Sequence, residues 1–85
     1  MLKRGQKYYC ETKEDVDLIM SLLEKKNYTW ASGAAPRSQY QNAPIVYYID
    51  SSKDFTCDVT PSGYLINEST PVSNIRNKII SELRR

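Results

Sequence analysis

The longest periodic run of apolar side chains lies between residues 12 and 27. Thr12 is a suitable N-cap, and Asp15 three positions later completes an approximate capping box. Asn27 tolerates the left-handed backbone conformation that often ends a helix. The pattern therefore predicts an amphipathic helix from Thr12 to about Asn27. Its apolar face is formed by residues at three- and four-residue spacing, namely Val16, Ile19, Met20, Leu22 and Leu23.

Several short segments have the alternating or aromatic composition of β-strands. A Ser-Ser-Lys turn separates two of them, so these two are expected to pair as an antiparallel hairpin with Phe55, Cys57 and Val59 pointing inward. The first strand of that hairpin is apolar on both faces, which favours a central position in the sheet. The helix between the first two strands predicts that they run parallel, either adjacent or with one strand between them. The predicted strands are 6–11, 28–31, 45–50, 54–60 and 64–67.

A second and narrower apolar stripe predicts a helix at the end of the chain, formed by Ile75, Ile79, Ile80 and Leu83. Thr70 with Pro71 at the first helical position could begin this helix, and Ser73 is the alternative cap. The predicted element order is therefore β-α-β-β-β-β-α. We expect a single domain over residues 1–85, an α+β two-layer sandwich in which the helices cover one face of a mainly antiparallel sheet. So small a core needs most of its large apolar side chains for folding.

The charge of the chain is a weak signal. Twelve Lys and Arg residues against ten Asp and Glu residues give a formal net charge of +2, which by itself does not indicate nucleic-acid binding. No apolar run is long enough for a transmembrane helix, and no export signal follows the basic start, so we expect a location in the cytoplasm. Basic side chains do gather at the two ends of the chain, and they would form one patch if the termini meet. These side chains are Lys3, Arg4, Lys7, Arg84 and Arg85.

Groups that could carry chemistry are sparse. Without histidine, a Ser-His or Cys-His nucleophile cannot form, and Cys10 and Cys57 lack further ligands for zinc. Both cysteines are expected to be buried and reduced. A disulfide between them is the alternative if their strands are adjacent. Asp50, Asp54 and Asp58 are better explained as turn and outward strand positions than as a cation site. We expect neither enzymatic activity nor a cofactor.

The segment 32–43 contains no aliphatic side chain larger than alanine and is the longest non-periodic stretch. Its polar and aromatic side chains are typical of a recognition loop, although a surface loop without a binding role has the same composition. Gly33 permits close backbone approach, and Arg37 offers a planar guanidinium to a phosphate or carboxylate. Outward tyrosines of the sheet, Tyr9 and Tyr48, form a second candidate surface. The candidate binding residues are Gly33, Arg37, Ser38, Gln39, Tyr40, Asn42 and Tyr48.

Residues 12–33 resemble a pattern in small bacteriophage and prophage proteins of unassigned function. In those proteins a short strand and a Thr-capped helix lead into a strand with an aromatic-x-Trp-x-Ser-Gly sequence. The resemblance covers about a quarter of this chain, and it implies a phage accessory protein with a sheet-plus-helix fold without transferring any functional residue. The matching residues are Thr12, Leu22-Leu23 and Asn27-Tyr28-Thr29-Trp30-Ala31-Ser32-Gly33, with Asn27 where glycine is common.

Three hypotheses of function follow. In the first, the chain is a non-enzymatic, phage-encoded binding protein that inhibits or modulates a host or defence protein by occupancy, through the 32–43 loop and the sheet face. In the second, it is a sponge for a small anionic ligand such as a nucleotide, bound by Arg37, Ser38 and Tyr40 in a homo-oligomer. In the third, it is a weak nucleic-acid-binding module that uses the basic termini.

Overall fold

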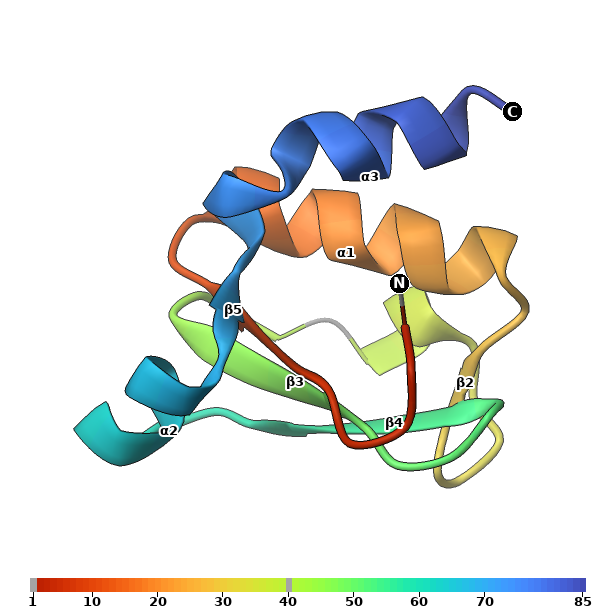
Figure 1. Cartoon of the computed structure of the whole chain (residues 1–85). Helices are drawn as coiled ribbons and strands as arrows, with labels where there is room; N and C mark the ends of the chain where they lie inside the picture. The colour runs from red at the N-terminus through yellow and green to blue at the C-terminus, as the bar shows by residue number, and fades with distance from the viewer. Residues whose placement is uncertain (1, 40) are drawn as a thin grey trace.

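The computed structural model describes residues 2–39 and 41–85. These residues form an α+β fold with a five-stranded mixed sheet and three α-helices (Figure 1). The prediction of an α+β fold is therefore confirmed. In chain order the elements are β1 (Lys7–Cys10), α1 (Lys13–Lys25), β2 (Thr29–Trp30), the 3-10 turn η1 (Pro36–Gln39), β3 (Ile45–Ile49), β4 (Asp54–Asp58), α2 (Gly63–Glu68), β5 (Thr70–Pro71), the 3-10 turn η2 (Val72–Asn74) and α3 (Arg76–Leu83).

Helix α1 begins and ends as its sequence predicts. The Thr12 hydroxyl accepts a hydrogen bond from the Asp15 backbone N–H, and the Asp15 carboxylate accepts from the N–H groups of Glu11 and Thr12. Asn27 follows the helix with a φ of 63°, in the left-handed region. All five apolar residues of the predicted stripe are fully buried. Each contributes roughly 1.5–3 kcal/mol through burial, so α1 supplies much of the stability of this small domain.

The sheet has the strand order β2-β4-β3-β1-β5. The predicted hairpin is confirmed, because β3 and β4 pair antiparallel with Ile49 opposite Phe55, and β3 is central as expected. β1 also pairs antiparallel with β3, whereas the outer pairs β1–β5 and β2–β4 are parallel. It follows that β1 and β2 run in the same direction. Two strands separate them, so the expectation of at most one strand between them is wrong.

The predicted fifth strand at 64–67 is wrong, because this segment forms helix α2. The Ser62 hydroxyl accepts a hydrogen bond from the Leu65 N–H and caps the helix. Leu65 is only half-buried, so its strand propensity was not reinforced by packing. The fifth strand is instead Thr70–Pro71, predicted to begin a helix; it lies at a sheet edge, where proline is tolerated. The observed order is therefore β-α-β-β-β-α-β-α.

The last helix, α3, starts later than predicted. It begins at Arg76 after the 3-10 turn η2, and Ile75 stands at its N-cap position without a side-chain hydrogen bond. Neither Thr70 nor Ser73 caps it. The early part of the predicted helix is used instead to complete the sheet and to place Val72 in the core.

Helices α1 and α3 lie on the same side of the sheet (Figure 1). The core lies between them and the sheet, and it contains a cluster of three aromatic rings from β2, β3 and β4. The ring centroids of Trp30 and Phe55 are 4.4 Å apart, and those of Tyr47 and Phe55 are 6.0 Å apart. The Trp30 side chain is only 7% exposed. The tryptophan is therefore a core residue, as the small size of the domain led us to expect.

The two cysteines are too far apart to pair. Both thiols are free; Cys10 lies in β1 and Cys57 in β4, with β3 between these strands. Neighbouring strands are about 4.8 Å apart, so the two backbones are about 10 Å apart, beyond the roughly 7 Å limit for a disulfide. Cys10 is buried as predicted. Cys57 is only half-buried and Val59 is exposed beyond the end of β4, which corrects the prediction that both point fully inward.

The two thiols should differ in reactivity. Burial raises the pKa of both thiols, and a carboxylate raises each further, Asp15 for Cys10 and Asp58 for Cys57. Cys10 is the more deeply buried of the two. Because the thiolate is the reactive form, we expect a thiol reagent at pH 8 to modify Cys57 at least about tenfold faster than Cys10. The variant Cys57→Ser should lose the faster phase, whereas Cys10→Ser should keep it. Equal rates for the two thiols in the folded protein would contradict the burial of Cys10.

Candidate functional site

The first half of the 32–43 loop is folded back onto Trp30. The Gly33 N–H donates to the Trp30 carbonyl at 2.7 Å, and the Trp30 N–H donates to the Ala34 carbonyl at 2.9 Å. The Trp30 indole N–H reaches the Pro36 carbonyl at 2.9 Å. Gly33 has a φ of +91°, a conformation that favours glycine. Its role in the structure is thus to make the turn that returns the chain to the tryptophan.

Arg37 is bound to helix α1. Its guanidinium donates to the Glu24 carboxylate, to the Ser21 hydroxyl at 2.6 Å and to the Asp17 carbonyl at 3.3 Å. Its guanidinium also lies 3.7 Å from the Asp17 carboxylate. An anionic ligand at Arg37 would have to compete with two carboxylates. The residue that the sequence suggested as the anion-binding group therefore anchors the loop to α1.

The other predicted loop residues do not converge on one point. The Ser38 hydroxyl donates to the Ala35 carbonyl at 2.6 Å, and Gln39 is exposed at the end of η1. Tyr40 lies outside the described residues. Asn42 is exposed and lies at the far end of the loop, at the start of α1. The loop therefore presents separate polar groups.

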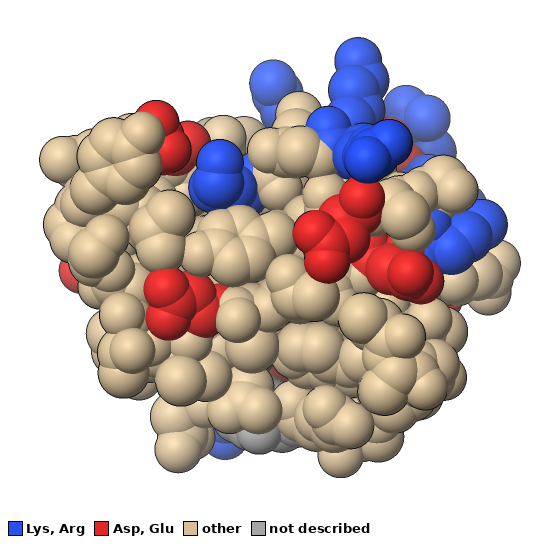
Figure 2. Space-filling model, turned by 90° about the horizontal axis from the view of Figure 1, so that it is seen from below, with Lys and Arg blue, Asp and Glu red and all other residues tan. Residues whose placement is uncertain are grey.

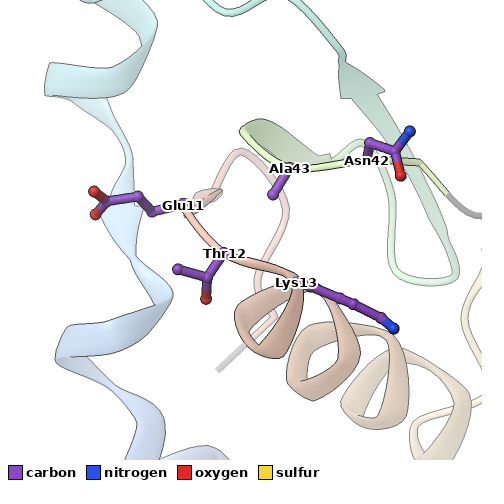
Figure 3. A pocket seen from close by; sticks show the side chains of 5 residues that line it. All are labelled: Glu11, Thr12, Lys13, Asn42 and Ala43. Carbon is purple, nitrogen blue, oxygen red and sulfur yellow. The ribbon is translucent and has the colours of Figure 1, made fainter.

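An open pocket of about 530 Å³ lies beside Asn42, at the N-terminus of α1. Figure 3 shows that Glu11 extends to one side of it, whereas Lys13 and Asn42 extend to the other. The backbone N–H groups that a helix start could offer to an anion are partly used by Thr12 and Asp15. The pocket thus lacks convergent donors. It is lined by Glu11, Thr12, Lys13, Asn42 and Ala43.

Tyr48 lies on the opposite side of the molecule from Arg37. Along β3, Ile45, Tyr47 and Ile49 belong to the core cluster. Since successive strand residues point to opposite faces, Val46 and Tyr48 point away from α1 and α3. We call this the outer sheet face, and define it by the residues that share it in the strand register, namely Lys7, Tyr9, Val46, Tyr48, Thr56 and Asp58.

Tyrosine side chains dominate the middle of the outer sheet face. Tyr9 is directly opposite Val46, and Tyr48 is the next outward residue along β3, so the two tyrosines are diagonal neighbours. Both are half-buried, and Val46 is fully buried although it is not part of the core cluster. The pKa of Tyr48 is raised by burial and by the nearby Asp58 carboxylate. Its hydroxyl therefore stays protonated at neutral pH and can both donate and accept a hydrogen bond.

Helix α2 borders this face. The Lys7 ammonium lies 3.9 Å from the Glu68 carboxylate, and Tyr64 of α2 is 69% exposed. Figure 2 shows the molecule from this side: uncharged side chains cover most of it, Lys and Arg gather along one margin, and acidic side chains lie beside that margin and at separate places on the face. Sequence reasoning missed the contribution of α2, because it placed Tyr64 in a strand.

The structure does not unite the predicted site residues. Arg37 and its loop lie against α1 on the helix side, whereas Tyr48 lies on the outer sheet face. The described ranges, 2–39 and 41–85, hold no group of three or more His, Cys, Asp or Glu side chains placed to bind a metal ion. Asp58 accepts a hydrogen bond from the Thr60 N–H, while Asp50 and Asp54 border a turn in which the Ser51 hydroxyl accepts from two N–H groups.

No family model matches the chain, and neither a curated protein nor a solved structure matches it. In the part of the chain that the structure describes, none of the helices has the length and apolar character needed to cross a membrane. The structure thus defines a small α+β domain with a five-stranded mixed sheet and two separate candidate surfaces.

Proposed function

We propose that the chain is a non-enzymatic binding protein that inhibits or modulates another protein by occupying part of its surface. In this proposal the architecture acts as a two-layer sandwich with a mainly antiparallel centre. Helices α1 and α3 support one face of the sheet, and the partner covers the other face. Following the resemblance of residues 12–33 to phage accessory proteins, we propose a phage-encoded protein that acts on a host or defence protein in the host cytoplasm.

The observation that carries this proposal is the pair of half-buried tyrosines on the outer sheet face, Tyr9 and Tyr48. Tyrosine combines a large apolar ring with a polar tip, and it is enriched in protein interfaces. The fully buried Val46 beside them gives the rings a rigid base. Lys7 and Asp58 share this face, and they are the charges that a partner covering it would have to pair.

The loop supports this proposal less directly. Arg37 already donates hydrogen bonds to Glu24 and Ser21 and forms an ion pair with Asp17. It therefore gives little support to the hypothesis that the chain is a sponge for an anionic ligand. We therefore assign the main contact to the outer sheet face, and we assign to Arg37 the role of holding the first half of the loop against α1.

The test is capture of a partner from an extract of a bacterial host by the tagged chain, with affinity then measured on the purified partner. The double variant Tyr9→Ser/Tyr48→Ser should weaken binding at least about tenfold, which corresponds to about 1.4 kcal/mol. The loop variant Arg37→Ala and the α3 surface variant Asn77→Ser should bind like the wild type. Circular dichroism should show that each variant is folded at the assay temperature.

Two results would contradict this assignment. If the tyrosine variant keeps its affinity, the outer sheet face is not the contact; if only Arg37→Ala loses it, the contact lies in the loop. The anti-defence role is tested separately. Expression of the chain should raise the plating efficiency of a phage that the host defence restricts, and the tyrosine variant should not. A captured partner without any effect on plating would argue against a role in defence.

A further inference from the structure

Seven of the twelve Lys and Arg residues lie at one end of the molecule. The C-terminal ends of α1 and α3 lie there, together with the turn between β3 and β4 (Figure 1). The N-terminal segment before β1 lies beside them. We call this region the basic end and define it as Lys3, Arg4, Lys25, Lys26, Lys53, Arg84 and Arg85. The Gly5 N–H, next to Arg4, donates to the Ile49 carbonyl at 2.8 Å, so the basic end borders the outer sheet face close to Tyr48. Part of the basic end forms the margin of Lys and Arg in Figure 2.

Specific contacts hold the basic end together. The Lys25 ammonium donates to the carbonyls of Glu82 and Arg85, which ties the end of α1 to the end of α3. The Lys53 ammonium lies 3.4 Å from the Lys26 carbonyl. On the N-terminal side, the Tyr28 hydroxyl donates to the Leu2 carbonyl at 2.7 Å. The termini therefore lie near each other, which was the condition that the sequence left open for a single basic patch.

The positive charge of this end is only partly neutralised. Lys26 and Arg85 lie 3.2 and 3.8 Å from the Glu82 carboxylate, and hydrogen bonding and attraction from Lys26 lower the pKa of Glu82, so this group stays ionised. Asp50 and Asp54 add negative charge beside Lys53. Lys3, Arg4 and Arg84 are exposed and form no ion pair with any other described residue. Three cations thus remain available to an external anion.

We propose that the basic end binds the phosphodiester backbone of duplex nucleic acid. Several cations that the fold gathers at one end suit a ligand with closely spaced negative charges. Tyr8 and Tyr28 both form hydrogen bonds with Leu2, next to Lys3, and both rings are buried, with exposed fractions of 2% and 8%. Within residues 2–39 and 41–85 the exposed aromatic ring is that of Tyr64 in α2, away from this end, so contact here is with phosphates and independent of sequence. The proposal rests on the cations of the basic end and uses none of the tyrosines of the outer sheet face.

The test is fluorescence anisotropy of a labelled 20-base-pair duplex of mixed sequence, titrated with the full chain. Three phosphate contacts predict a slope of about −2.7 for log K against log salt concentration, or about a 40-fold loss of affinity between 50 and 200 mM salt. The variant Arg4→Glu/Arg84→Glu should weaken binding at 50 mM salt at least about tenfold and reduce the slope to about −0.9. A second duplex of different sequence should bind within about twofold.

The matched control is Lys13→Glu/Lys78→Glu, which changes the net charge by the same amount. Lys13 begins α1 at the opposite end of the molecule, and Lys78 precedes Arg84 by six residues in α3. This control should keep most of the affinity, whereas an equal loss in both variants would overturn the assignment to the basic end. A flat salt dependence, or binding to anionic lipid vesicles without binding to the duplex, would also overturn it. Unchanged duplex binding by Tyr9→Ser/Tyr48→Ser should separate this site from the protein-binding face.

Discussion

Replacing Trp30 with alanine should destabilise the protein by about 3–5 kcal/mol. The indole packs 4.4 Å from the ring of Phe55 and 6.1 Å from that of Tyr47, measured between centroids. The substitution opens a cavity in this cluster and also removes the hydrogen bond from the indole N–H to the Pro36 carbonyl. A domain of this size has a total stability of only about 5–15 kcal/mol, so much of the margin would be lost.

Thermal and urea unfolding followed by circular dichroism measure this effect. A loss of 3 kcal/mol lowers the melting temperature of a domain of 60–100 residues by at least about 12 °C. The variant Trp30→Phe keeps a ring in the cluster but cannot donate to Pro36, so it should lose less stability than the alanine variant. If Trp30→Ala stays within about 1 kcal/mol of the wild type, the aromatic cluster is not an important part of the core.

Helix α1 could be predicted closely because all of its signals are local. The capping box, the apolar stripe and the left-handed residue at its end all lie within sixteen residues of sequence, and each acts through neighbouring backbone groups. The β3–β4 hairpin was predictable for the same reason. Its strands are separated by a short turn, and one of them is apolar on both faces.

The region after β4 could not be predicted in the same way, because its structure depends on distant partners. The segment Gly63–Glu68 has strand-like side chains, yet Ser62 caps it as a helix and no neighbouring strand is available to it. Thr70 and Pro71 look like a helix start, but they complete the sheet because Tyr8 and Tyr9 of β1 lie beside them. Contacts with distant parts of the chain thus determined the structure of α2 and β5, although the local sequence favoured a different structure for each.

The candidate sites show the same division between local and distant information. An Arg in a polar loop indicates anion binding only if it is free, and the three groups of α1 that bind Arg37 lie 13 to 20 residues earlier in the chain. Tyr48 could be placed on an outward face from alternation alone. Its neighbours from β1 and β4 depend on strand register, which no short segment specifies.

The basic end was visible in the sequence only as two charged termini. In the sequence, Lys25 and Lys26 suit the negative C-terminal end of a helix dipole, and Lys53 belongs to a turn. The fold adds these three cations to the termini because α1 and α3 run in the same direction and end side by side (Figure 1). A surface of this kind arises from the packing of helices, so its charge cannot be counted from composition.

Replacing Ile79 with alanine should lower the stability by about 2–5 kcal/mol. Ile79 is fully buried and belongs to the core cluster, whereas the adjacent Ile80 is only half-buried. The variant Ile80→Ala removes the same atoms from the same helix, and it should lose about 1 kcal/mol or less, because little cavity forms at a partly exposed position.

The two isoleucine variants are compared by urea unfolding, with hydrogen exchange of the α3 amides as a second measurement. Because Ile79 is the one fully buried side chain within the described residues of α3, its loss should also speed exchange in that helix more than in α1. That outcome would mean that α3 is held on α1 and the sheet chiefly through one side chain. Equal losses in the two variants would contradict the orientation of α3, and with it the placement of Arg84 and Arg85 beside the end of α1.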